Sequence, residues 1–122
     1  LGDVYKRQTK PSPTKIADDV FNSLPIPAEE ISVEKAPDNS MDRAGIHEGT
    51  VLFLRKKAKA QVGNIVLLEY AGKKTLRRFT AFERGFRLVP ESSDSGLTDF
   101  ILPRGAELAH SGIVVYVLSE PK

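Results

Sequence analysis

The sequence predicts a mainly β domain, in which about seven short strands form a twisted, partly closed antiparallel fold with little helix. Three observations predict it. Apolar runs of strand length recur along the chain, turns rich in glycine separate them, and no βαβ alternation indicates a parallel sheet. The chain has 122 residues, 40% apolar and 28% charged, which is ordinary for one globular domain with a buried core.

The early part of the chain predicts a leader and one short helix. Residues 1–13 show no periodicity and contain two prolines, so we expect a linker or a non-native leader there. Residues 14–24 place apolar side chains at helical spacing and predict a helix that ends before Pro25. The predicted domain therefore runs over residues 14–122.

The predicted strands follow from residue 31 onward. Ile31 and Val33 alternate with polar neighbours, which indicates the first strand. The later segments are short apolar or alternating runs that end at a glycine turn or a proline, with hairpin turns expected at 71–73 and 83–85. These further strands are predicted at 50–55, 64–70, 74–82, 86–89, 99–102 and 107–118.

The composition excludes several classes of site. The chain has no cysteine, which excludes disulfides, thiolate metal sites and a cysteine nucleophile, and fits a cytoplasmic protein. His47 and His110 lack metal-ligand spacing, so we expect no metal and no cofactor. The apolar runs are strand-sized, and no membrane span is expected. A net charge of +2 is too small to predict nucleic-acid binding, and the basic clusters at 55–57 and 73–78 are interpreted as solvated strand ends.

One segment, residues 38–49, has the features of a site. Ser40 is well placed to cap one helical turn that Gly45 would end. Its hydroxyl would then lie near free backbone N–H groups, which can stabilise an oxyanion. From spacing alone, a capping serine in a loop is the simpler interpretation and a nucleophile is the alternative.

The order of motifs along the chain resembles a known family. Ser40-Met41 followed by Ala-Gly-Ile at 44–46 is similar to the serine motif of the signal-peptidase-like Ser-Lys autopeptidase domains of LexA, UmuD and phage repressors. The resemblance spans residues 31–118. Four further segments resemble strands or motifs of these domains in the same order, at 63–68, 75–79, 88–92 and 112–117.

This resemblance implies a self-cleaving, dimerising domain of an SOS or prophage transcription repressor. Ser40 would be the nucleophile, Asn39 and Met41 would lie in the substrate and oxyanion region, and a lysine on the strand at 75–79 would be the general base. Burial would lower the pKa of that lysine toward neutrality. The implied partners are a second copy of the chain and a RecA filament as trigger, with DNA bound only through a missing N-terminal helix-turn-helix domain.

Three departures from the family pattern argue against self-cleavage. Arg77 occupies the position of the lysine, and a guanidinium stays protonated at any usable pH. Asp38 replaces a glycine two residues before the serine, where we expect the backbone to need freedom. No Ala-Gly or Cys-Gly bond precedes Ser40, so the sequence offers no clear self-cleavage target.

We therefore expect a dimerising regulatory domain in which self-cleavage is weakened or lost. The first alternative is an active Ser-Lys autopeptidase that uses Lys74 or a shifted strand register. An odd offset from Arg77 puts Lys74 on the opposite face of the strand unless a bulge re-aims it. His47 is another candidate base. The second alternative is a non-catalytic β binding module whose serine is only a cap. We expect the last strand, 113–118, to pair across a two-fold axis.

Overall fold

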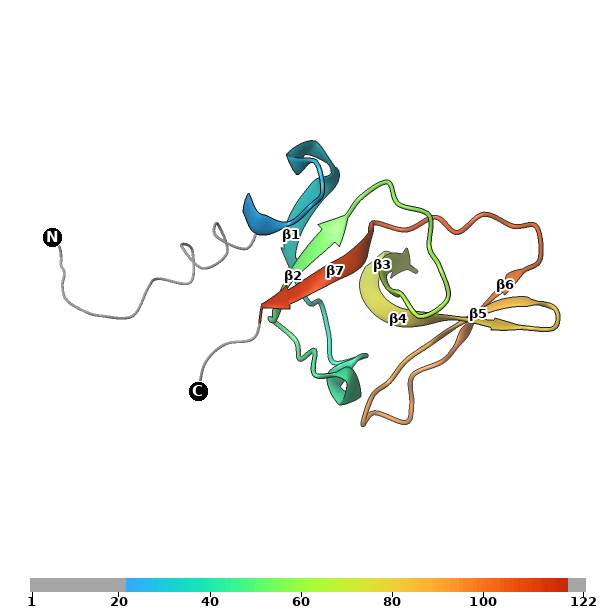
Figure 1. Ribbon diagram of the computed structural model, residues 1–122. Coiled ribbons are helices and arrows are strands. Elements are labelled where there is room, and N and C mark those ends of the chain that lie inside the picture. The colour runs from blue at the N-terminus through green and yellow to red at the C-terminus, as the bar shows by residue number, and fades with distance from the viewer. Residues whose placement is uncertain (1–21, 119–122) are drawn as a thin grey trace, which may run out of the picture.

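One antiparallel sheet of seven strands dominates the computed structural model, which describes residues 22–118 (Figure 1). The strands lie in the order β1-β2-β7-β3-β4-β5-β6. The predicted mainly β class is therefore confirmed. The strand bounds are β1 (Ile31–Lys35), β2 (Val51–Arg55), β3 (Ile65–Tyr70), β4 (Lys73–Phe82), β5 (Gly85–Val89), β6 (Phe100–Pro103) and β7 (Gly112–Leu118).

Helix is sparse in the part of the chain that the structure describes. Two short 3-10 segments, η1 (Ala28–Glu30) and η2 (Asp42–Ala44), flank β1. The helix predicted at 14–24 lies outside the described residues except for its last three positions. Between residues 22 and 118, no helix is long and apolar enough to cross a membrane.

Both predicted hairpins are present. Tyr70 pairs with Lys73 across a turn in which Ala71 and Gly72 have φ values of 53° and 80°. Two consecutive positive φ angles give the turn twist that suits the two flanking strands. The second hairpin joins β4 to β5, whose pairing begins at its turn.

The last strand is shorter than the sequence predicts. The expected strand ran over 107–118, but β7 begins at Gly112. The His110 ring lies 2.8 Å from the carbonyl oxygen of Ala58, and Leu108 packs against an apolar cluster outside the strand ladder. These contacts hold the segment before Gly112 against a loop and not within the sheet.

The curled sheet has an apolar cluster on each side. Val66 and Leu68 belong to one cluster and Leu67 to the other, because successive side chains of a strand point to opposite faces. β3 is thus buried on both faces, which explains its unbroken apolar run. The first cluster consists of Ala36, Met41, Ile46, Leu52, Leu54, Leu67 and Leu76, and the second of Val66, Leu68, Phe79, Leu88 and Ile113.

The two edges of β7 are paired to different extents. Its pairing with β2 runs from Ile113 to Leu118, with one register shift. Its pairing with β3 involves only Gly112 and Ile113. Beyond Ile113, residues 22–118 place no strand on that second edge, where Val115 is 36% and Tyr116 43% exposed.

Candidate active site around Ser40

Ser40 lies on the loop between β1 and β2, which buried side chains anchor. Ala36, Met41 and Ile46 belong to the first apolar cluster, and Met41 and Ile46 form an isolated bridge. The predicted helical turn is present as η2 and ends at Gly45, whose φ is 88°. The interpretation of Ser40 as its cap is wrong, because Met41 occupies the cap position and no side chain caps η2.

The Ser40 hydroxyl is completely buried and fully hydrogen-bonded. The residue is 0% exposed, and its Oγ donates to Asp38 Oδ1 at 2.5 Å. The backbone N–H of Ser40 donates to the same oxygen at 3.0 Å. In turn, Ser40 Oγ accepts the backbone N–H of Leu76 at 3.2 Å. β5 pairs with β4 only from Arg78 onward. The Leu76 N–H therefore has no acceptor from β5, and Ser40 Oγ supplies one.

The second carboxylate oxygen of Asp38 leads to Arg77. Thr75 Oγ1 donates to Asp38 Oδ2 at 2.8 Å and accepts from Arg77 Nη1 at 2.6 Å. A 3.4 Å contact from Thr75 Oγ1 to Ser40 Oγ is secondary, because the hydroxyl has one proton and Asp38 is closer. The four residues therefore form one continuous hydrogen-bond network.

Arg77 is held on all sides and is only 3% exposed. Its Nε donates to the carbonyl oxygen of Thr98 at 3.1 Å, and its guanidinium lies 4.7 Å from the centre of the Phe100 ring. Burial lowers the pKa of Arg77, whereas the charges of Asp38 and Asp99 raise it. The side chain still offers donors only, because a guanidinium in a protein keeps its proton.

The segment that follows β5 supports the serine loop from a second direction. The backbone N–H of Glu91 donates to the carbonyl oxygen of Ser40 at 3.0 Å. The Glu91 carboxylate accepts two hydrogen bonds of 2.9 Å from the Arg78 guanidinium. Ser92 Oγ donates to the carbonyl oxygen of Asn39 at 2.8 Å. The sequence analysis gave Glu91 no role at the site, although its place in a family-like motif at 88–92 was an available signal.

Lys74 lies apart from this network. Its ammonium donates to Glu34 Oε1 at 3.0 Å, and the residue is exposed. The pairing of β3 with β4 runs without a register shift through this region. The interpretation of the basic cluster at 73–78 as solvated holds for Lys73 and Lys74 and is wrong for the buried Arg77.

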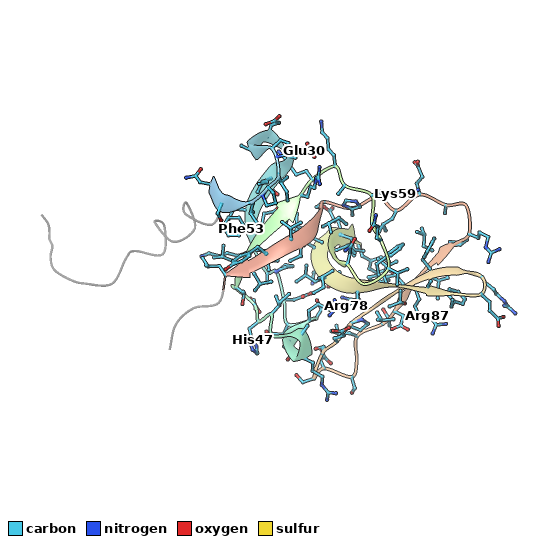
Figure 2. The ribbon with its side chains drawn as sticks, in the orientation of Figure 1. Glu30, His47, Phe53, Lys59, Arg78 and Arg87 are labelled. Atoms are coloured by element: carbon cyan, nitrogen blue, oxygen red, sulfur yellow. The ribbon has the colours of Figure 1, made fainter. Side chains whose placement is uncertain are left out.

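The other candidate residues have local partners of their own. The amide oxygen of Asn39 accepts the backbone N–H of Glu48 at 2.8 Å, and Met41 is buried in the first apolar cluster. His47 lies exposed on the loop after η2, at the periphery of the molecule (Figure 2). Its backbone N–H donates to Thr50 Oγ1 at 3.2 Å.

Thr75 was not predicted at the site, and Asp38 has a different effect there from the one predicted. Thr75 and Arg77 are two positions apart on a strand, so a shared face was predictable. Asp38 was expected to disturb a permissive backbone position, but Ala71 is the only non-glycine residue with a positive φ in the described chain. Asp38 affects the site through the hydrogen bonds of its carboxylate and not through its backbone conformation.

A cleft of about 780 Å³ opens beside the network. Asp38, Thr75 and Arg77 line it, together with Lys73 and the ring of Tyr70, whereas the buried Ser40 does not. The network therefore faces the cleft through a carboxylate and a guanidinium.

Comparison with known proteins identifies the family. Residues 7–115 match the Peptidase S24-like family, which is most of the chain. The chain belongs to this family. The S24 chain is 31% identical over 102 residues to the LexA repressor of Lacticaseibacillus casei (strain BL23), and the alignment covers 80% of this chain and 47% of that protein. The LexA repressor of Lacticaseibacillus paracasei (strain ATCC 334) gives the same figures. The chain thus spans about half the length of the relatives it matches.

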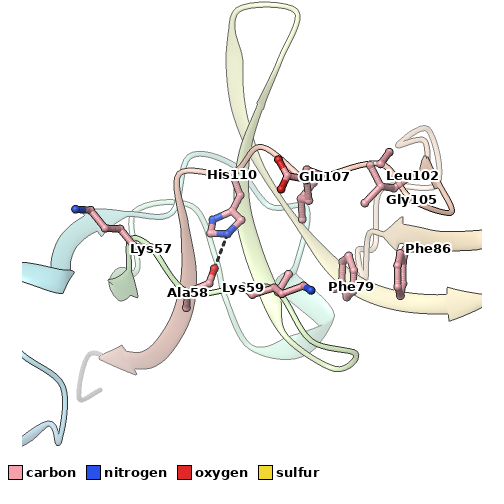
Figure 3. A pocket seen from close by; sticks show the side chains of 12 residues that line it. Lys57, Ala58, Lys59, Phe79, Phe86, Leu102, Gly105, Glu107 and His110 are labelled. Carbon is pink, nitrogen blue, oxygen red and sulfur yellow. Dashed lines mark hydrogen bonds between the residues drawn. The ribbon is translucent and has the colours of Figure 1, made fainter.

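The S24 domain has a second cavity, of about 620 Å³, that none of the candidate site residues lines. Figure 3 shows its stacked Phe79 and Phe86 rings, whose centres are 4.6 Å apart, and His110 beside Ala58. Because a carbonyl oxygen only accepts, His110 Nε2 is the donor to Ala58. The buried Nδ1 has no hydrogen-bond partner within the described chain. This cavity is separate from the network around Ser40.

Proposed function

We propose that this S24 domain is the dimerising regulatory domain of a LexA-like repressor in which self-cleavage is weakened or lost. One observation carries the proposal: the Ser40 hydroxyl donates to the Asp38 carboxylate. The motif resemblance, in which Arg77 falls at the position of the general-base lysine, supports it. The family match and the LexA relatives support the repressor context. Under the proposal the protein acts in the cytoplasm, in an SOS or prophage response.

The chemistry of the site supports the loss of cleavage. A serine attacks a peptide bond when a nearby base accepts its proton at working pH. A carboxylate is a much weaker base than a neutral, desolvated lysine, and a guanidinium is not a base at all. Neither Asp38 nor Arg77 can therefore replace the lysine at neutral pH. The complete burial of Ser40 also separates its hydroxyl from a substrate.

The free part of β7 supports dimerisation. An unpaired strand edge presents a row of N–H and C=O groups that a second strand can pair with. Two copies of β7 related by a two-fold axis would pair antiparallel and bury Val115 and Tyr116, which are exposed in the single chain. In this proposal, DNA binding belongs to a helix-turn-helix domain outside this sequence, and a RecA filament remains the trigger for any cleavage that survives.

Self-cleavage of the full-length parent protein tests the proposal. The protein is incubated at neutral and at alkaline pH and analysed on a denaturing gel over time, with Ser40→Ala as the matched control. We expect one intact band in both proteins. Two fragments that disappear in Ser40→Ala would contradict the proposal and favour an active Ser-Lys autopeptidase, with Lys74 as the first base to replace.

The variant Arg77→Lys extends this test, because it restores the family residue at the base position. With a supplied peptide that contains an Ala-Gly bond, we expect some cleavage if the missing lysine is the main defect. If Arg77→Lys remains inactive, Asp38 is the deeper defect, and Asp38→Gly combined with Arg77→Lys is the next variant to measure.

A further inference from the structure

We infer that Asp38, Thr75 and Arg77 form a clasp, in which Thr75 and Arg77 are buried and Asp38 is half-buried, and that this clasp makes Ser40 a structural tie between its loop and β4. The inference deepens the proposed loss of cleavage and rests on it in one respect: no catalytic base takes the proton of Ser40. Four observations carry it: the burial of Arg77, the complete pairing of Asp38, the Ser40–Leu76 hydrogen bond, and the support from Glu91.

The burial of Arg77 requires a nearby negative charge. Arg77 as a whole residue is 3% exposed, so its side chain has lost most of its water, and an unpaired buried charge is strongly destabilising. Asp38 supplies a negative charge through the hydroxyl of Thr75, with hydrogen bonds of 2.6 and 2.8 Å on the two sides of that oxygen. Asp38 and Arg77 are therefore expected to depend on each other energetically.

The shortest contacts of the network favour one placement of its protons. Arg77 has donors only, so Thr75 Oγ1 accepts from it and donates its own proton to Asp38 Oδ2. The other carboxylate oxygen accepts both the hydroxyl and the backbone N–H of Ser40. Asp38 thus accepts three hydrogen bonds. The proton of Ser40 Oγ points to Asp38, because Asp38 Oδ1 is its nearest acceptor, at 2.5 Å.

Ser40 joins three parts of the domain. Its Oγ accepts the N–H of Leu76 on β4, its N–H binds Asp38, and its carbonyl oxygen accepts the N–H of Glu91. Loss of the hydroxyl would leave a buried backbone N–H and a carboxylate oxygen short of partners, which costs stability. Replacement of a catalytic residue commonly has the opposite effect and raises stability, because functional sites are held at the expense of stability.

Thermal unfolding of Ser40→Ala tests the structural role of the serine. We expect its Tm to fall by at least about 4–8 °C, the shift that corresponds to one unsatisfied buried hydrogen bond in a domain of this size. The matched control is Ser95→Ala at an exposed loop serine, for which we expect no resolvable shift. An unchanged or raised Tm in Ser40→Ala would overturn the inference.

A double-mutant cycle tests the clasp itself. Asp38→Asn and Arg77→Met each remove one charge, and we expect each to lower the Tm by several degrees. The double variant should lose clearly less than the sum, because neither charge is left without its partner. The control cycle combines Asp38→Asn with Arg55→Gln, whose carboxylate partner is Glu30, and should be additive. Additivity of Asp38 with Arg77 would overturn the clasp.

Milder variants keep the test decisive if Arg77→Met does not fold. Arg77→Lys retains a charge, and Thr75→Val removes only the bridging hydroxyl. In a Thr75→Val background we expect the coupling between Asp38→Asn and Arg77→Lys to shrink, and an undiminished coupling would overturn the role of Thr75. These measurements do not depend on cleavage. Fragments from the wild-type parent would overturn the proposed function alone, whereas additivity in the cycle would overturn the clasp alone.

Discussion

At the scale of single residues, Glu91 and Asp42 contribute to the pH dependence of this domain. Hydrogen bonds from Arg78 hold the pKa of the Glu91 carboxyl below its usual range, against the opposing effect of burial. Hydrogen bonds from Ser93 lower the pKa of Asp42 in the same direction. Because folding favours the ionised forms, their stabilisation is present above the unfolded-state pKa of about 4 and is lost as the pH falls through the lower folded-state values.

The variant Glu91→Gln isolates one of these carboxyl groups. We predict a lower Tm than wild type at neutral pH, and a smaller drop in Tm between neutral pH and the acid range, because a carboxyl group whose pKa is lowered in the folded state is gone. Tm curves against pH provide the measurement, with Glu48→Gln at an exposed loop position as control. Curves for wild type and Glu91→Gln that run parallel into the acid range would contradict the assignment.

Sequence reasoning located the candidate residues but not their hydrogen bonds. Ser40 and Arg77 were identified because their motifs occur in family order. The partner of Ser40 was not predictable, because the orientation of the Asp38 carboxylate depends on Thr75, which follows it by 37 positions. Only the folded sheet brings these two side chains together. The burial of Arg77 was missed for the same reason, since Thr98 and Phe100 cover it from beyond β5.

At the scale of elements, the turn between β3 and β4 offers a direct test of the hairpin. Ala71 adopts a φ of 53°, which lies in the left-handed region. This conformation is energetically unfavourable for a residue that has a Cβ atom. Asparagine tolerates this conformation better, and Asn-Gly is the preferred pair for such a turn. We predict that Ala71→Asn raises the free energy of unfolding by up to about 1 kcal/mol.

Chemical denaturation measures this change, and Ala71→Val is the matched control. A β-branched side chain is poorly suited to the left-handed region, so Ala71→Val should be less stable than wild type. If asparagine and valine shifted the unfolding midpoint in the same direction, the turn geometry would be wrong.

The strands were predictable where local pattern and tertiary burial agree. β3 and β4 were found almost at their bounds, because continuous apolar runs and glycine turns mark strands that are buried on both faces. The segment 107–111 was wrongly included in the last strand. Leu108 fits the apolar pattern of a strand, but it packs against the second cluster from a loop. A hydrogen bond from His110 to the carbonyl oxygen of Ala58 holds this loop in place. Sequence periodicity does not distinguish these two kinds of burial.

At the scale of the whole molecule, the edge of β7 that residues 22–118 leave unpaired predicts a dimer. We expect wild-type protein to dimerise in a concentration-dependent way, and Tyr116→Lys to weaken the dimer at least about tenfold by placing a charge on the paired edge. Light scattering over a range of concentrations provides the measurement. The matched control is Ile101→Lys on β6, which is 55% exposed at the other end of the sheet. A wild-type mass that stays monomeric at all concentrations would contradict the prediction.

The domain as a whole belongs to the S24 family, and the polar groups around Ser40, the proposed nucleophile, are arranged as one hydrogen-bond network. Covalent labelling of Ser40 by a serine-directed fluorophosphonate, read by mass spectrometry of the intact domain, tests this most directly because it needs no cleavable bond. We predict that the wild-type domain stays unlabelled, and that Asp38→Gly combined with Arg77→Lys becomes labelled. Stoichiometric labelling of the wild type that is lost in Ser40→Ala would contradict the account.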